Sequence, residues 1–106
     1  MKRHRVLAVI ALVAGIVQPA VAQSDGASVY ASKCQMCHAE DGTGGTPAGK
    51  ALKTPSLLTP AVVKESNAEL NEAITKGRGR MPAFAGRLTA TEINDVTGYI
   101  RKLQKQ

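Results

Sequence analysis

The sequence has 106 residues, a formal net charge of +6 and only three aromatic side chains, with no tryptophan. A chain of this length forms one small domain, in which apolar side chains alone supply only about 3–5 kcal/mol of stability. Something other than large side chains must therefore fill the centre of the domain. No aromatic residues alternate with basic ones, so the sequence carries no nucleic-acid-binding motif and we expect no nucleic acid partner.

Residues 1–22 are predicted to form a secretory signal peptide. The basic start "MKRHR" is followed by an apolar run, Val6–Val17, that is too short to span a membrane comfortably. Small residues at Ala20 and Ala22 provide a cleavage site after Ala22. The alternative is an uncleaved N-terminal anchor.

Cleavage leaves one domain, residues 23–106, which is not expected to span the membrane. Three basic residues leave with the signal peptide, so the net charge falls from +6 to +3. The predicted location is the periplasm, an oxidising compartment in which two cysteines usually form a disulfide.

The remaining segments predict helices joined by loops, and none predicts a strand. Ser24 or Asp25 can cap a first helix, whose buried face is expected to carry Gly26, Val29, Tyr30 and Cys34. Residues 39–53 contain four glycines and a proline without periodicity, which predicts an irregular loop.

Two capping boxes predict the later helices. One helix is expected over about residues 67–76, ending at Gly77, and the capping residues Thr89 and Glu92 begin another that continues to the C-terminus. The segment between them, residues 77–86, is expected to be a loop.

The segment "CQMCH", residues 34–38, matches the pattern for covalent attachment of haem c. On one helical turn Cys34 and Cys37 can each form a thioether with a haem vinyl group. The next residue, His38, is then placed to ligate the iron through an imidazole nitrogen. One covalently bound haem c is therefore the predicted cofactor.

Three other uses of these residues are open. A thioredoxin-like redox pair normally follows a buried strand, which this sequence lacks. A structural zinc ion needs four ligands, and residues 23–106 contain only three good ones, Cys34, Cys37 and His38. A disulfide between the cysteines would close a very short loop and add little stability.

The second axial ligand of the iron is predicted by elimination. Residues 23–106 contain no second histidine and only two methionines. Met36 lies between the anchoring cysteines on the His38 side of the haem, so its sulfur cannot reach the opposite face. Met81 remains, in a loop whose Pro82 favours extended backbone. A lone loop methionine is otherwise usually a packing residue.

Most of the chain resembles class I c-type cytochromes of the short bacterial monohaem kind. The likeness covers residues 25–104 and includes "TPSL". Its most specific parts are the "CQMCH" motif, and Gly77 with Met81–Pro82 ahead of a final helix that ends in Tyr99–Ile100. It implies an all-α fold of about three to four helices wrapped around one haem. The first and last helices would cross near Gly26, Tyr30 and Tyr99.

The same resemblance implies further residues of the haem pocket. In this family a proline carbonyl accepts a hydrogen bond from the ligating histidine, and Pro55 fits this role by position, with Leu57 packing on the haem. Pro47 remains an alternative to Pro55. Three arginines that flank the Met81 loop either lie near the haem propionates or are simply solvated: Arg78, Arg80 and Arg87.

An iron with both axial positions occupied has no open site for substrate, so the expected function is single-electron transfer. We expect a carrier between a donor, a dehydrogenase or quinol-oxidising complex, and an acceptor such as a terminal oxidase. Transient docking at the haem edge would be steered by basic residues: Lys33, Lys50, Lys53, Lys76 and Arg78. The alternatives are a dedicated haem subunit of a periplasmic dehydrogenase, and a ligand-binding or catalytic haem protein with an open distal site.

Overall fold

The computed structural model describes residues 7–15 and 25–106, and these residues form helices and loops without a β-strand. The helices are α1 (Gly26–Lys33), α2 (Gln35–His38), α3 (Pro47–Ala51), α4 (Pro60–Val63), α5 (Asn67–Lys76) and α6 (Ala90–Leu103). The predicted all-α class is confirmed. The predicted cleavage site after Ala22 lies outside the described residues.

Residues 7–15 are exposed and adopt no helix. Across the described ranges, the search for a helix both long enough and apolar enough to cross a membrane finds none.

The long helices begin and end where their capping residues predict. In α5, the Ser66 hydroxyl accepts a hydrogen bond from the Glu69 amide, and the helix ends at Gly77 with a φ of 77°. In α6, the Thr89 hydroxyl accepts from the Glu92 amide while the Glu92 carboxylate accepts from the Thr89 amide. The reciprocal capping box is thus complete in α6, whereas α5 has only the bond to the Ser66 hydroxyl. Both caps are local features, so the sequence alone is enough to place them.

Two short helices were not predicted. α3 lies inside the segment 39–53 that was expected to be an irregular loop, and α4 precedes α5. Each begins with a threonine at the N-cap and a proline at the next position, Thr46–Pro47 and Thr59–Pro60. Helices of four or five residues are too short to show a helical period in the sequence, which is why these two were not predicted. With the short helices included, the described part of the chain has six helices, where three to four were expected.

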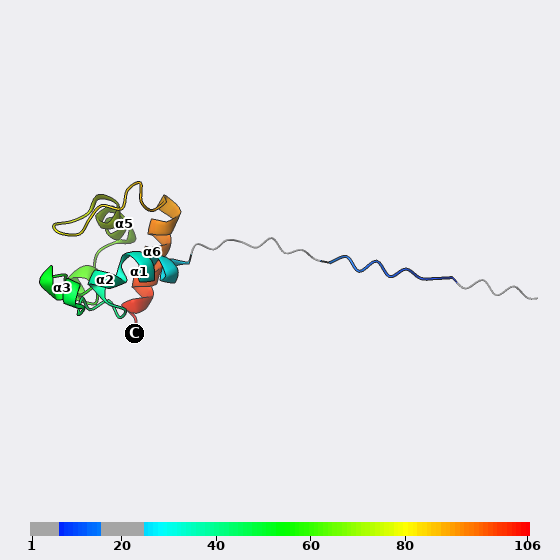
Figure 1. Ribbon diagram of the computed structural model, residues 1–106, viewed down its shortest axis with the longest axis horizontal. Coiled ribbons are helices and arrows are strands. Elements are labelled where there is room, and N and C mark those ends of the chain that lie inside the picture. The colour runs from blue at the N-terminus through cyan, green and yellow to red at the C-terminus, as the bar shows by residue number, and fades with distance from the viewer. Residues whose placement is uncertain (1–6, 16–24) are drawn as a thin grey trace, which may run out of the picture.

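The first and last helices cross, as the resemblance implied (Figure 1). A Cβ atom at Gly26 would collide with the backbone carbonyl of Asp95 and lie 3.2 Å from the Cβ of Tyr99. The rings of Tyr30 and Tyr99 lie 5.1 Å apart at an interplanar angle of 47°. The helices therefore approach to backbone contact at Gly26, and a tilted aromatic pair lies beside this crossing.

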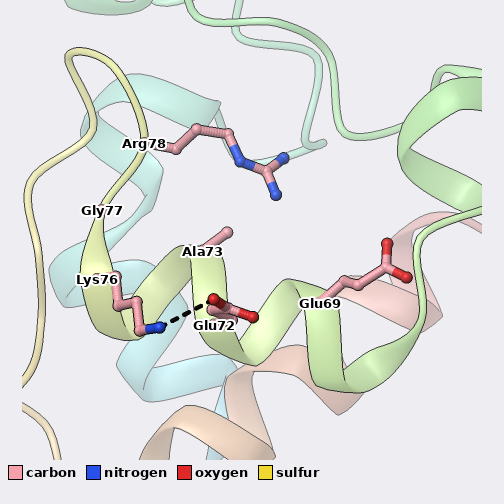
Figure 2. Close-up of a pocket in the computed structure, with 6 residues that line it drawn as sticks. All are labelled: Glu69, Glu72, Ala73, Lys76, Gly77 and Arg78. Carbon is pink, nitrogen blue, oxygen red and sulfur yellow. Dashed lines mark hydrogen bonds and ion pairs between the residues drawn. The ribbon is translucent and has the colours of Figure 1, made fainter.

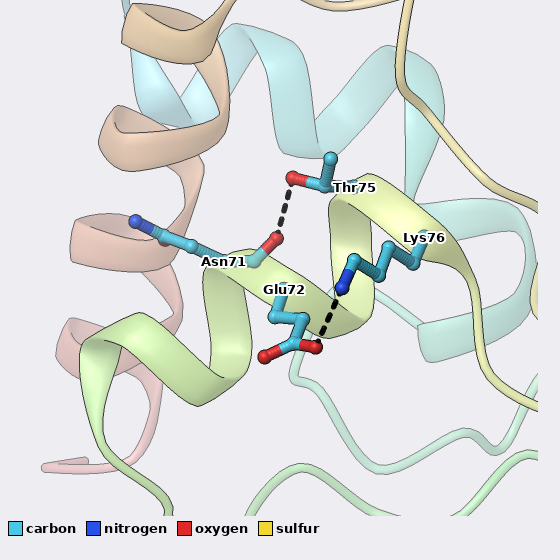
Figure 3. Close-up of polar contacts among 4 residues, drawn as sticks. All are labelled: Asn71, Glu72, Thr75 and Lys76. Carbon is cyan, nitrogen blue, oxygen red and sulfur yellow. Dashed lines mark hydrogen bonds and ion pairs between the residues drawn. The ribbon is translucent and has the colours of Figure 1, made fainter.

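A polar connection joins α5 to α6 within the core. The hydroxyl of the buried Thr97 in α6 donates to the side-chain oxygen of Asn71 in α5 at 2.5 Å. Within α5, the Thr75 hydroxyl donates to the Asn71 backbone carbonyl at 2.7 Å (Figure 3). These bonds satisfy polar groups that would otherwise be costly to bury. The middle of α5 is thus bonded to α6 through Asn71.

Figure 1 shows where the segments that carry His38 and Met81 lie relative to α1 and α6. The segment after α5 and the segment of α2 and α3 extend toward the same side of the crossed helices α1 and α6, one above the other in this view. The two predicted axial ligands, His38 and Met81, come from these two different segments.

Candidate functional site

The two cysteines and the histidine lie on one continuous turn at the junction of α1 and α2. Cys34 ends α1, and its carbonyl accepts from the amides of Cys37 at 3.2 Å and His38 at 2.9 Å. Cys34 is buried, Cys37 is half-buried, and both are free thiols. The three residues therefore share one backbone turn, as the haem-attachment pattern predicts.

The environment of Cys34 does not favour a reactive thiolate. Burial raises the pKa of the Cys34 thiol to about 11. Catalytic cysteines in disulfide oxidoreductases instead have a lowered pKa, which keeps them as thiolates near neutral pH. The described residues also contain no cluster of three or more ligands suited to a metal ion. Neither the redox-pair nor the zinc alternative gains support.

The chain turns sharply directly after His38. Ala39 has a φ of 67°, a conformation that is uncommon for a residue with a side chain. Its carbonyl accepts a hydrogen bond of 2.6 Å from the buried Tyr30 hydroxyl, so the turn is tied to the crossing of α1 and α6.

The following loop wraps closely around this turn. The Gly44 amide donates to the His38 carbonyl at 2.8 Å, and the Thr46 hydroxyl donates to the Met36 carbonyl at 2.5 Å. A Cβ atom at Gly49 would collide with the Cys37 carbonyl. The loop therefore fixes the backbone of the motif through contacts with three of its carbonyl groups.

The His38 ring fits an iron ligand. Its Nδ1 atom is buried and has no hydrogen-bond partner among the described residues, and burial lowers the pKa of the imidazole. The neutral ring, which is the form that binds metals, is thereby favoured. A buried nitrogen without a hydrogen-bond partner destabilises the fold, so its presence in a native protein calls for a functional explanation.

The two predicted residues of the haem pocket, Pro55 and Leu57, lie in the loop between α3 and α4. Pro55 is exposed, and a bond from His38 Nδ1 to its carbonyl stays a prediction for the haem-loaded protein. The alternative, Pro47, is the first residue of α3. Leu57 is half-buried and packs against the core, and its amide donates to the Gly42 carbonyl at 2.8 Å.

The two methionines differ sharply in exposure. Met36 is 77% exposed, whereas Met81 is half-buried and packs against the core. Met81 lies in a short hairpin, residues 78–81, in which Met81 and Arg78 exchange two backbone hydrogen bonds of 2.9 and 3.2 Å. We call this segment the Met81 hairpin. Its ligation of iron stays a prediction, but of these two side chains only that of Met81 packs against the protein interior.

The three arginines near Met81 have separate environments. Arg78 forms an ion pair of 2.8 Å with Glu65, and the guanidinium of Arg87 lies 5.0 Å from the centre of the Phe84 ring. Arg80 is exposed. Glu65 was not predicted, because no local pattern relates it to Arg78, which lies beyond the other end of α5.

Two hollows on the surface are not lined by residues of the motif. One, of about 270 Å³, is lined by Glu69, Glu72, Ala73, Lys76, Gly77 and Arg78 (Figure 2). The other, of about 560 Å³, lies between residues 39–46 and the end of α6. Neither is lined by Cys34, His38 or Met81, so neither is the haem site.

Comparison with known proteins agrees with this geometry. Residues 21–100 match the family model for subunit III of cbb3-type cytochrome c oxidase. Cytochrome c6 of Picosynechococcus is 40% identical over 101 residues, which cover 89% of this chain and 86% of that protein. Subunit CcoP of the cbb3-type oxidase of Cereibacter sphaeroides is 33% identical over 85 residues, 79% of this chain but 28% of that protein.

A solved structure shares the fold. The KustC0563 c-type cytochrome superposes with a TM-score of 0.69 at 27% identity, covering 76% of this chain and 98% of that one. The chain therefore belongs to the c-type cytochrome family, as a small class I monohaem cytochrome with one covalently bound haem c.

Proposed function

We propose that this protein is a periplasmic single-electron carrier whose haem iron is ligated by His38 and Met81. The observation that carries the proposal is the contrast between the methionines. Met81 is half-buried against the core, while Met36 is 77% exposed. With both axial positions filled by the protein, no position is open for substrate, which suits electron transfer.

Each residue has a defined part in this proposal. The haem supplies an iron that alternates between the ferrous and ferric states. Cys34 and Cys37 would hold the macrocycle at the end of α1, and the neutral His38 ring would supply a nitrogen ligand. The Met81 thioether favours the ferrous state and so raises the reduction potential.

Relatives of two kinds, cytochrome c6 and a cbb3-type oxidase subunit, support an electron-carrying role. This chain accounts for 86% of the cytochrome c6 relative but only 28% of the CcoP subunit. We infer transient docking at the haem edge between a dehydrogenase or quinol-oxidising complex and an acceptor such as a terminal oxidase. Because such partners must separate after each transfer, a small contact patch is expected.

Carbon monoxide tests whether the iron is fully ligated. The reduced wild-type protein is expected to keep its visible spectrum under carbon monoxide at neutral pH, because His38 and Met81 leave no vacant position. A near-infrared sulfur-to-iron band in the oxidised protein should accompany this result. A large, immediate spectral change with carbon monoxide would instead support the ligand-binding alternative.

Electrostatic steering predicts a rate that depends on salt. Two of the expected steering residues are already paired within the protein, Lys76 with Glu72 and Arg78 with Glu65. The other three are Lys33 at the end of α1 and, on the α3 side, Lys50 and Lys53. Stopped-flow reduction or oxidation by an acidic redox protein should slow by about tenfold between low and high ionic strength.

A matched pair of variants locates the steering charge. Lys53→Gln is expected to lower the low-salt rate more than Lys76→Gln, although both remove one positive charge. Equal rates for the two variants, or a rate insensitive to salt in the wild type, would contradict steering from the α3 side.

A further inference from the structure

The Met81 hairpin is firmly attached at one end. After Met81, the amides of Phe84 and Ala85 donate to the carbonyls of Ile74 and Thr75 at 3.0 and 3.1 Å, and the Phe84 side chain is buried. These contacts fix the chain where it leaves the hairpin and returns along the end of α5.

At the other end, the hairpin follows directly from Gly77 at the end of α5, and its Arg78 side chain is joined to Glu65. The Arg78 guanidinium lies 2.8 Å from the Glu65 carboxylate, whose side chain is only 19% exposed. The same Glu65 is held from behind, because the Arg101 guanidinium donates to its backbone carbonyl and, at 2.8 Å, to the Asn67 side chain. Glu65 is therefore a fixed anchor and not a freely moving surface carboxylate.

On its α5 side, Arg78 borders a hollow in the surface. The hollow of about 270 Å³ lies there, and four of its six lining residues are charged. Figure 2 shows the Arg78 side chain extending over α5, with Glu72 and Lys76 paired to each other and not to Arg78. The Glu65–Arg78 pair thus joins the first residue of the hairpin to the linker between α4 and α5.

We propose that Glu65 and Arg78 position the Met81 sulfur, by holding the hairpin closed against displacement of this ligand from the iron. The proposal rests on the function proposed above, in which Met81 is an axial ligand. Two backbone hydrogen bonds couple Arg78 directly to Met81. A hairpin released from Glu65 spends more time open, so an external ligand can replace the sulfur more readily.

The displacement equilibrium measures this effect. Imidazole competes with Met81 for the ferric iron, and its apparent affinity rises with the fraction of open hairpin. A single ion pair that is partly exposed on one side should change this affinity by about two- to fivefold. Both Arg78→Gln and Glu65→Gln are therefore expected to bind imidazole about two- to fivefold more tightly than the wild type.

Arg80→Gln is the matched control. Arg80 is an exposed arginine in the same hairpin, so its replacement removes the same charge near the haem while leaving the Glu65–Arg78 pair intact. The haem-loaded full-length proteins would be titrated with imidazole, following loss of the near-infrared sulfur band. The double variant of Glu65 and Arg78 should equal either single variant, because each removes the same interaction.

The outcomes separate the two proposals. Absence of the sulfur band in the wild-type protein would contradict ligation by Met81 itself. If the band is present, but Arg80→Gln tightens imidazole binding as much as Arg78→Gln, general charge and not the ion pair sets the equilibrium. Additive effects in the double variant would also overturn the positioning role.

Discussion

Replacing Met81 with alanine is expected to abolish the near-infrared sulfur band and to open one axial position of the iron. The reduced variant should then bind carbon monoxide at neutral pH. Loss of the thioether also removes a ligand that favours the ferrous state, so the reduction potential should fall by on the order of 100 mV. Spectroscopy, carbon monoxide titration and potentiometry of the haem-loaded variant measure these three effects.

Met36→Ala is the control for this experiment. The substitution removes the same side chain from the haem-attachment motif, but the Met36 side chain is 77% exposed, whereas that of Met81 packs against the core. We expect the Met36 variant to keep the sulfur band and a potential close to that of the wild type. A Met81 variant that retained the band would disprove ligation by this residue.

Gly26→Ala is expected to be the most destabilising small substitution at the crossing of α1 and α6. The added Cβ atom would overlap the Asp95 carbonyl, which belongs to a helix backbone and cannot rotate away. Separating the helices would also disturb the Tyr30–Tyr99 contact. Overpacking of this kind costs about 1–3 kcal/mol. For a domain of this size, each kcal/mol lowers Tm by about 4–8 °C.

The same substitution at Gly98 provides an internal control. Gly98 lies within α6, is exposed, and an added Cβ atom there would meet nothing within 4 Å. Alanine is the better helix former, so Gly98→Ala should raise stability by about 0.5–1 kcal/mol. Thermal unfolding of the haem-loaded proteins compares the two. Equal Tm values for both variants would show that close helix packing at Gly26 does not limit stability.

Much of the site follows from short stretches of sequence. The spacing of Cys34, Cys37 and His38 requires only one helical turn, which the structure shows. The caps at Ser66 and Thr89 likewise depend on residues three positions apart, and both α5 and α6 begin as predicted. α3 shows the limit of this approach, because a five-residue helix inside a glycine-rich loop has no detectable period.

Only the tertiary structure shows which residues support the site from a distance. The Glu65–Arg78 pair joins residues on either side of α5, and no periodicity relates them. The bond from Tyr30 to Ala39 depends on the packing of α1 against α6. Likewise, counting ligands along the chain favoured Met81 over Met36, but their different burial appears only after folding.

The sequence by itself determined the haem-attachment turn and the ends of the long helices, because these depend on residues within a few positions of one another. The tertiary structure decided how closely α1 and α6 approach and what holds the Met81 hairpin. Those features arise from contacts between segments that are distant in the chain, and their geometry is set by packing of the whole domain.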